Sequence, residues 1–222
     1  MMFNMKISSV IFDMDGTICD TSEGIFNSIR YAEKKMGLRS ASIEQMKTHL
    51  GPSIIDSYSK NYNLTGKDLE LAVSLHKEYS LAKGLYESSV YGYVPDLMRF
   101  LKEKGIKITV ATLKLDDVAK KIIQHHKLDR YVDYVFGALP NKKVTKEELI
   151  KKCIDATGCN RSETIMIGDS NQDYEGAKKN GIAFIAALYG YGYRHKTETK
   201  EDCLFCAETV FDMIDYFKTS SE

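Results

Sequence analysis

Three short apolar runs of this sequence each lead into side chains that can take part in chemistry. These side chains are Asp13 and Asp15 after the first run, Thr112 at the end of the second, and Asp169 and Asp173 after the third. Carboxylates gathered at one place repel one another strongly unless a cation binds among them. Carboxylate and carbonyl oxygens are the ligands that hard divalent cations prefer, and Mg²⁺ is the cofactor that we expect.

The apolar runs read as buried β-strands, because each is short, rich in β-branched residues and bounded by turn-forming or polar residues. The strands expected in this way span 7–12, 107–112, 134–137, 164–168, 182–187 and 204–206. The helices expected between them span 96–104, 115–125, 145–157, 173–180 and 209–217. Strands that alternate with helices predict a parallel sheet covered on both faces. Ligands bind beyond the carboxyl ends of such strands, so the polar side chains should meet at one edge.

Residues 20–92 have a different pattern, in which apolar residues recur at helical spacing. The helices expected there span 22–36, 42–50, 53–62 and 67–85, and no strand is expected among them. The last of these helices presents Leu71, Leu75, Tyr79 and Ala82 as its apolar face.

The fold class that follows is α/β, with a doubly wound parallel-sheet (Rossmann-like) core. An all-helical cap domain is inserted after the first strand. We expect the core to comprise residues 1–19 and 93–222, and the cap to comprise residues 20–92.

The motifs resemble those of the haloacid dehalogenase (HAD) superfamily. The resemblance is carried by Asp-Met-Asp-Gly-Thr at 13–17, Thr112, a downstream lysine and Gly-Asp-Ser-Asn-Gln-Asp at 168–173. Their order and spacing match the members whose helical cap follows the first motif, and the resemblance covers nearly the whole chain. The segments 12–21, 166–182 and 188–192 are most similar to the phosphoglycolate-phosphatase-like branch.

The resemblance implies a phosphatase, a phosphoric monoester hydrolase, and assigns a role to each polar residue. Asp13 would be the nucleophile that forms an aspartyl-phosphate, and Asp15 would protonate the leaving alcohol and then activate water. The Asp13 carboxylate, the Asp15 main-chain carbonyl and Asp169 would hold the Mg²⁺ ion. Asp173 would orient a neighbouring ligand, and Thr112 and one lysine would hold the phosphoryl oxygens.

The lysine of the phosphate site has three candidates, Lys142, Lys143 and Lys146. We favour Lys146, because it begins a helix in the manner of the family pattern, whereas the other two fall in the preceding loop. Lys114 is a further candidate for the rim of the site.

Other activities of the same superfamily remain as alternatives. Asp15 argues against dehalogenases and phosphonate-cleaving enzymes, which lack an aspartate at this position. A sugar phosphomutase would use the same core residues as a phosphatase, although Thr17 favours the phosphatase slightly. A non-catalytic phosphate-binding protein would keep the fold without turnover. Phosphoglycolate, a nucleoside 5′-monophosphate and pyrophosphate all remain candidate substrates.

Several residues outside the main motifs lie where they can shape the site. Gly51 and Pro52, between two expected cap helices, resemble the family's specificity loop and could dip into the active site. His49 either packs among these helices or faces the substrate. Asp20 reads as a helix N-cap. Residues 189–193 read as a loop near the site.

Composition limits the partners of the chain. Lysine plus arginine equals aspartate plus glutamate at 31 each, which argues against nucleic-acid binding by bulk charge. No apolar run approaches the ~20 residues that span a bilayer, and no secretion signal is evident. Five scattered cysteines suit a reducing cytoplasm. We expect a small phosphorylated metabolite as partner, no nucleic acid, no membrane, and a monomer or weak homodimer.

Overall fold

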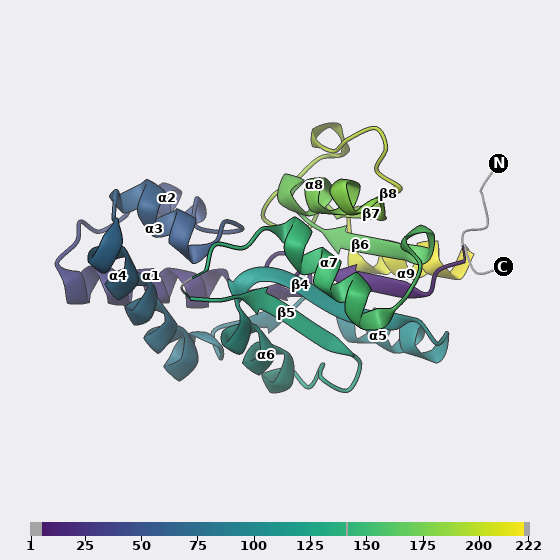
Figure 1. The fold of residues 1–222 in the computed structure, drawn as a ribbon, viewed down its shortest axis with the longest axis horizontal. Coiled ribbons are helices and arrows are strands. Elements are labelled where there is room, and N and C mark those ends of the chain that lie inside the picture. Colours follow the sequence, from purple (N-terminus) through teal and green to yellow (C-terminus); the bar gives the residue numbers. More distant parts are fainter. Residues whose placement is uncertain (1–5, 141, 220–222) are drawn as a thin grey trace.

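A six-stranded parallel sheet, in the order β5-β4-β1-β6-β7-β8, forms the centre of the protein (Figure 1). The structure is a computed structural model that describes residues 6–140 and 142–219. The strands are β1 (Ser9–Phe12), β4 (Lys107–Leu115), β5 (Tyr134–Ala138), β6 (Thr164–Gly168), β7 (Ala183–Ala187) and β8 (Phe205–Ala207). This sheet confirms the predicted α/β core.

Helices cover both faces of the sheet, because alternate strand residues point to opposite faces and both sets are apolar. Val10 and Phe12 belong to one hydrophobic core and Ile11 to the other. The first core contains residues of α5 (Val94–Glu103), α6 (Asp116–His125) and α9 (Val210–Thr219). The second contains residues of α7 (Lys146–Thr157) and α8 (Asn171–Asn180). The arrangement is doubly wound, as predicted.

Strand β1 lies between β4 and β6, which brings Asp13 beside polar residues of both neighbouring strands. Phe12, its last residue, is in register with Val110 of β4 and Ile167 of β6. The chain therefore leaves β1 at Asp13 beside the end of β6, while β4 continues past this point, at the edge where ligands bind in such sheets.

The expectation that β4 ends on Thr112 is wrong. The strand continues to Leu115 by pairing with β5, and its register shifts between Ala111 and Leu115. Such irregularities re-aim side chains and are common beside active sites. Thr112 lies within the irregular stretch, beyond the last residue of β4 that pairs with β1.

Helices form a second body between β2 (Cys19–Asp20) and β3 (Ser89–Val90), which we call the cap. Its helices are α1 (Ser22–Met36), α2 (Ile43–Lys47), α3 (Ile54–Tyr62), α4 (Gly66–Tyr79) and the π-helix η1 (Ser80–Gly84). Two short 3₁₀ helices, η2 (Arg161–Glu163) and η3 (Lys196–Glu198), lie outside it. The cap helices pack around a separate apolar cluster that includes Ile29, Met46 and Tyr58. Figure 1 shows them beside the sheet rather than on its faces.

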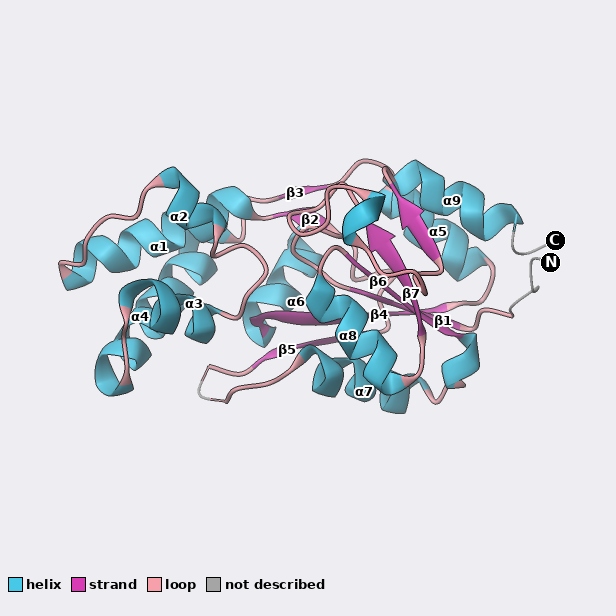
Figure 2. Ribbon diagram, turned by 90° about the horizontal axis from the view of Figure 1, so that it is seen from above, coloured by secondary structure: helices cyan, strands magenta, loops and turns pink. Residues whose placement is uncertain are grey.

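The expectation of no strand within residues 20–92 is wrong. Strands β2 and β3 form an antiparallel pair in which Cys19 lies opposite Val90 (Figure 2). Strands of two residues have no alternation that a sequence pattern can reveal. The pair joins the two chain connections between cap and core.

The apolar face expected for the helix at 67–85 is wrong in part, since Leu75 packs against the cap cluster but Leu71 and Ala82 are exposed. Leu71 is 49% exposed, whereas Ala72 and His76 are buried. The α-helix ends at Tyr79 and continues as a π-helix. A polar histidine on the inward face misleads a count of apolar residues, because that count assumes that buried residues are hydrophobic.

No helix within the described ranges is long and apolar enough to cross a membrane. All five cysteines are free thiols.

Candidate active site

Asp13 is held at the end of β1 by a buried lysine. Its backbone N–H donates to the carbonyl of Ile167 at 2.9 Å, which ties the strand end to β6. Lys146 Nζ lies 2.7 Å from Asp13 Oδ1 and 2.8 Å from Asp173 Oδ1. The same ammonium donates to the carbonyl of Ala111 at 3.1 Å. Lys146 thus links Asp13, which follows β1, to Asp173 of α8 and to the backbone of β4.

Of the three candidate lysines, the structure places Lys146 beside Asp13. A capping box begins α7 at this residue, so its side chain extends from the first turn into the site. Lys142 and Lys143 are exposed, and Lys143 Nζ instead lies 3.1 Å from Asp56 Oδ1 on the cap. Lys146 is therefore the candidate whose ammonium group contacts Asp13.

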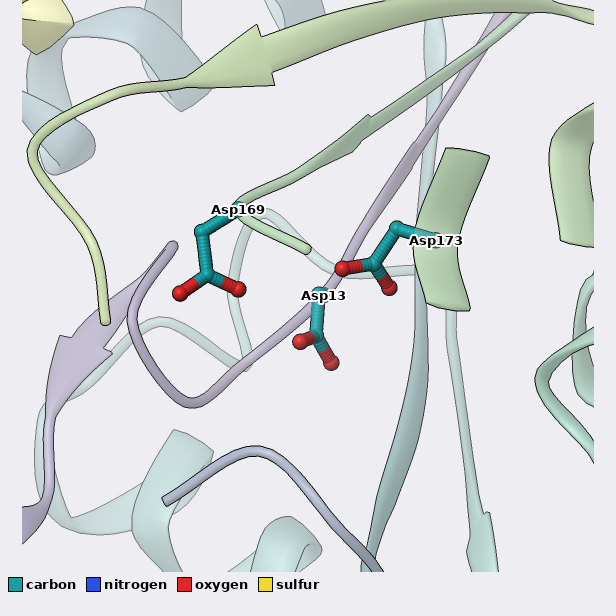
Figure 3. A group of neighbouring side chains, drawn as sticks. All are labelled: Asp13, Asp169 and Asp173. Atoms are coloured by element: carbon teal, nitrogen blue, oxygen red, sulfur yellow. The ribbon is translucent and has the colours of Figure 1, made fainter. Parts of the chain in front are cut away.

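Three buried carboxylates converge beside this lysine. Asp13, Asp169 and Asp173 offer oxygen atoms that all lie within 4.8 Å of one another, and Figure 3 shows them pointing toward a common space. Asp173 Oδ2 already accepts from the N–H and hydroxyl of Ser170 at 3.1 and 2.6 Å, while its Oδ1 faces Lys146. Both oxygens of Asp173 thus face donors of the protein, whereas the contacts described for Asp13 and Asp169 involve one oxygen of each. Asp13 and Asp169 are therefore the carboxylates better placed to hold an ion.

The electrostatics of these carboxylates suit a divalent cation. Burial raises the pKa of Asp13 well above its usual value. Lys146 opposes the rise, and Asp173 and Asp169 add to it. Burial, followed by the charge of Asp173, raises the pKa of Asp169 to about 6. Both shifts reflect the cost of placing like charges together away from water, which a bound cation offsets. The donor set, all oxygen, fits Mg²⁺.

Residues 189–193 form the loop that orients Asp169. The N–H groups of Tyr191 and Gly192 donate to Asp169 Oδ2 at 2.6 and 3.0 Å. The N–H of Tyr193 donates to the main-chain oxygen of Asp169 at 2.7 Å. The loop was expected near the site, and its backbone is what supports Asp169.

Asp15 lies apart from the carboxylate cluster. Its Oδ1 accepts a hydrogen bond from the hydroxyl of Thr21 and lies 3.0 Å from Lys114 Nζ. Lys114, the rim candidate, is thus part of the site. Sequence reasoning missed Thr21, although it belongs to the first motif segment, because a hydroxyl eight residues after Asp13 has no chemical signature of its own.

Thr112 is buried with its hydroxyl directed by the backbone. The N–H of Lys114 donates to Thr112 Oγ1 at 3.1 Å. Because this bond uses the oxygen as an acceptor, the hydroxyl proton remains available for an anionic ligand.

Residues 10–187 match the family model of the haloacid dehalogenase-like hydrolases. The chain belongs to this family. A 5′-nucleotidase of Pseudomonas aeruginosa is 30% identical over 205 residues, covering 92% of this chain and 93% of the relative. The pyrophosphatase PpaX of Halalkalibacterium halodurans is 29% identical over 219 residues, covering 95% and 97%.

Solved structures agree with this assignment. The crystal structure of a predicted phosphatase from Clostridium acetobutylicum matches with a TM-score of 0.88 and 30% identity, covering 96% of this chain and 99% of that one. The predicted family and fold are therefore confirmed, as is the prediction of a phosphatase-type hydrolase.

In this HAD-family hydrolase Asp20 links the cap to the Asp169 loop. The expectation that Asp20 is the N-cap of the first cap helix is wrong, since that position is Thr21. Asp20 Oδ1 accepts from Ser22 N–H and Oγ at 3.0 and 2.7 Å and from the hydroxyl of Tyr191 at 2.7 Å. The first turn of α1 is thereby joined to the loop that carries Tyr191.

A cleft between core and cap opens onto the site of the hydrolase. It encloses about 550 Å³ including its opening to solvent. Its polar lining from the core comprises Asp13, Asp15, Thr112 and Lys114. Gly51 and Pro52 line the cap side, where the specificity loop was expected, together with His49, His76 and Ser80.

Proposed function

We propose that the chain is a Mg²⁺-dependent phosphatase that hydrolyses small phosphomonoesters through an aspartyl-phosphate on Asp13. The observation that carries the proposal is the placement of the Asp13 carboxylate, 2.7 Å from Lys146 Nζ and clustered with Asp169, at the floor of a cleft. The substrate class is a small phosphorylated metabolite, and the free thiols favour a reducing, cytoplasmic location.

In the first step an Asp13 oxygen attacks phosphorus and the bond to the ester oxygen breaks. A carboxylate is a weak nucleophile, so positioning and charge neutralisation supply most of the rate. Lys146 and Thr112 hold the phosphoryl oxygens in line with Asp13. Asp15 donates its proton to the leaving oxygen, so the alcohol departs uncharged.

In the second step Asp15, now a carboxylate, accepts a proton from water as the water oxygen attacks the phosphorus of the aspartyl-phosphate. Phosphate leaves and Asp13 is restored. Asp15 Oδ1 is occupied by Thr21 and Lys114, so we assign proton transfer to Oδ2. The cap covers the cleft and limits the entry of other water.

The carboxylates of Asp13 and Asp169 and the main-chain carbonyl of Asp15 would hold the Mg²⁺ ion. The ion supplies positive charge that lets a phosphate dianion approach a carboxylate. Asp173 acts by positioning Lys146 and the backbone at Ser170.

Metal removal gives a direct test. We expect EDTA to stop phosphate release from p-nitrophenyl phosphate, and excess Mg²⁺ to restore it, because the clustered carboxylates otherwise repel the substrate. Full activity in metal-free buffer would contradict the proposal. Incubation with a hexose 1-phosphate separates phosphatase from mutase, since free phosphate appears in one case and an isomeric sugar phosphate in the other.

Gly190→Ala is expected to weaken Mg²⁺ binding. A methyl group there would lie within 3.0 Å of the Cβ and Oδ2 atoms of Asp169 and of the carbonyl of Gly16, so Asp169 must move. Displacing a supported metal ligand typically costs about 10–100-fold in metal affinity, so half-maximal activity should need at least about tenfold more Mg²⁺. Gly92→Ala is the matched control, because a methyl group there meets nothing within 4 Å. An unchanged Mg²⁺ titration for Gly190→Ala would count against the role of Asp169.

A further inference from the structure

His49 of the cap is a buried polar side chain that lacks a partner. It is 3% exposed, and neither Nδ1 nor Nε2 has a hydrogen-bond partner among the described residues. Its ring packs near Tyr58 and Tyr62, with centroids 6.3 and 5.8 Å away. A buried donor and acceptor without partners destabilise the folded protein. An unpaired histidine at such a position therefore indicates a functional role, such as binding a ligand.

The position of His49 in the active-site cleft suggests this role. The ring lines the cleft that also contains Asp13 and Asp15, on the opposite, cap side. His76 and Ser80, which also belong to the cap, line the same cleft. Ser80 begins the π-helix η1, and such turns occur often at functional sites.

Burial favours the uncharged form of both His49 and His76. Burial lowers the pKa of His49, and the charge of Glu33 opposes this shift. Burial, and then the charge of Lys114 and the neighbouring His49, lowers the pKa of His76 to about 3. A neutral imidazole offers one N–H donor and one lone pair, which suits hydroxyl or carbonyl groups. Both nitrogens of His49 lack a partner, whereas His76 Nδ1 lies 3.4 Å from the hydroxyl of Tyr58, so Nε2 is the nitrogen of His76 that we assign to a ligand.

The cleft also lacks a spare positive charge for a second anion. Among the described residues that line it, Lys114 carries the ammonium group, and its Nζ is already 3.0 Å from Asp15 Oδ1. The remaining cap-side lining includes the apolar side chains of Ile25, Pro52 and Ile54. A carboxylate or second phosphate on the leaving group would lose its water here without gaining a counter-ion.

We propose that His49 and His76 bind the leaving group of the substrate, and that this group is an uncharged polyhydroxylated alcohol such as a sugar or nucleoside. The inference rests on the proposed phosphatase function and narrows its substrate class. It disfavours glycolate and phosphate as leaving groups, and hence phosphoglycolate and pyrophosphate as substrates.

The first test compares kcat/KM for the wild-type protein with Mg²⁺. Ribose 5-phosphate and uridine 5′-monophosphate carry the proposed leaving groups, a sugar and a nucleoside, and phosphoglycolate and pyrophosphate carry charged ones. We expect kcat/KM for ribose 5-phosphate or for uridine 5′-monophosphate to be at least about tenfold higher than for phosphoglycolate and for pyrophosphate. The reason is that a hydroxylated leaving group pairs with the buried histidines, whereas a charged one leaves them unpaired. Faster turnover of either phosphoglycolate or pyrophosphate overturns the inference.

The second test replaces His49 by phenylalanine, which keeps the ring and removes both nitrogens. We expect kcat/KM for the better of the two hydroxylated substrates to fall about 10–100-fold, and that for p-nitrophenyl phosphate to change less than about threefold. Because unpaired nitrogens are removed, the melting temperature should rise by about 2–4 °C. A merely structural histidine would give a lower melting temperature and equal losses on both substrates, and that result overturns the inference.

His125→Phe is the matched control, since His125 lies exposed at the end of α6 with its ring against Tyr86. It should leave the ratio of the two kcat/KM values unchanged. The outcomes also separate this inference from the proposed function. Failure of the wild-type protein to release phosphate from p-nitrophenyl phosphate overturns both. Hydrolysis of that ester without a selective effect of His49→Phe overturns the inference alone.

Discussion

Asp13→Asn should reduce phosphate release from p-nitrophenyl phosphate by at least about 10⁴-fold, a loss typical when the attacking group of an enzyme is removed. An amide cannot form the aspartyl-phosphate, and Lys146 and Thr112 can then only bind the substrate. The fold should survive, because asparagine has nearly the same size. The substitution also removes a carboxyl group whose pKa is raised by burial and by the neighbouring charges of Asp173 and Asp169. Steady-state kinetics with Mg²⁺, together with circular dichroism, measure the two effects.

Asp155→Asn provides the control for this substitution. Asp155 lies on α7, where its carboxylate is 58% exposed and pairs with Lys151 at 2.7 Å. Exposed pairs of this kind contribute little, about 0.3–0.5 kcal/mol, so activity and stability should stay near those of the wild type. Wild-type turnover by Asp13→Asn would exclude Asp13 as the nucleophile.

The core could be predicted because its physical signals are strong. Strands buried on both faces give short, nearly continuous apolar runs, and the strand at 164–168 begins and ends as expected. The polar residues after each run stand out against this background. Since parallel strands end at one edge, Asp13 and Asp169 could be brought together from sequence order alone.

The cap was harder to predict, because some of its buried residues pack in the apolar cluster and others line the cleft. Periodicity assigned Leu71 to the buried face of its helix, whereas His76 and Ser80 occupy that face. A buried polar residue is indistinguishable from a surface residue in a hydropathy pattern. The two-residue strands β2 and β3 were missed for a related reason. They pair residues that are about 70 positions apart, and such pairing gives no pattern in the local sequence.

The contacts that hold the site residues in place could not be predicted from the sequence either. The backbone N–H groups of Tyr191 and Gly192 hold Asp169, but backbone donors are present at nearly every residue and carry no identity. The family resemblance implied that a lysine binds phosphate, and the family pattern favoured Lys146 because it begins a helix. Only the folded arrangement shows that this ammonium also joins Asp13 to Asp173.

Lys146→Met should therefore cost both activity and stability. The variant keeps the length and apolar stem of lysine, but it leaves Asp13 and Asp173 buried without their shared cation. Breaking a buried ion pair in this way costs about 3–5 kcal/mol, which a urea or guanidinium titration detects as an earlier unfolding midpoint.

Lys143→Met removes an equal charge from an exposed side chain that contacts Asp56, and this control should unfold near the wild-type midpoint. Mg²⁺ distinguishes the two functions of Lys146. The ion should restore part of the stability of Lys146→Met, because it neutralises Asp13, but not the activity, because the phosphoryl oxygens still lack the ammonium. An Lys146→Met variant with a wild-type unfolding midpoint in metal-free buffer would contradict the ion-pair role. Normal turnover by the same variant would contradict the phosphate-binding role.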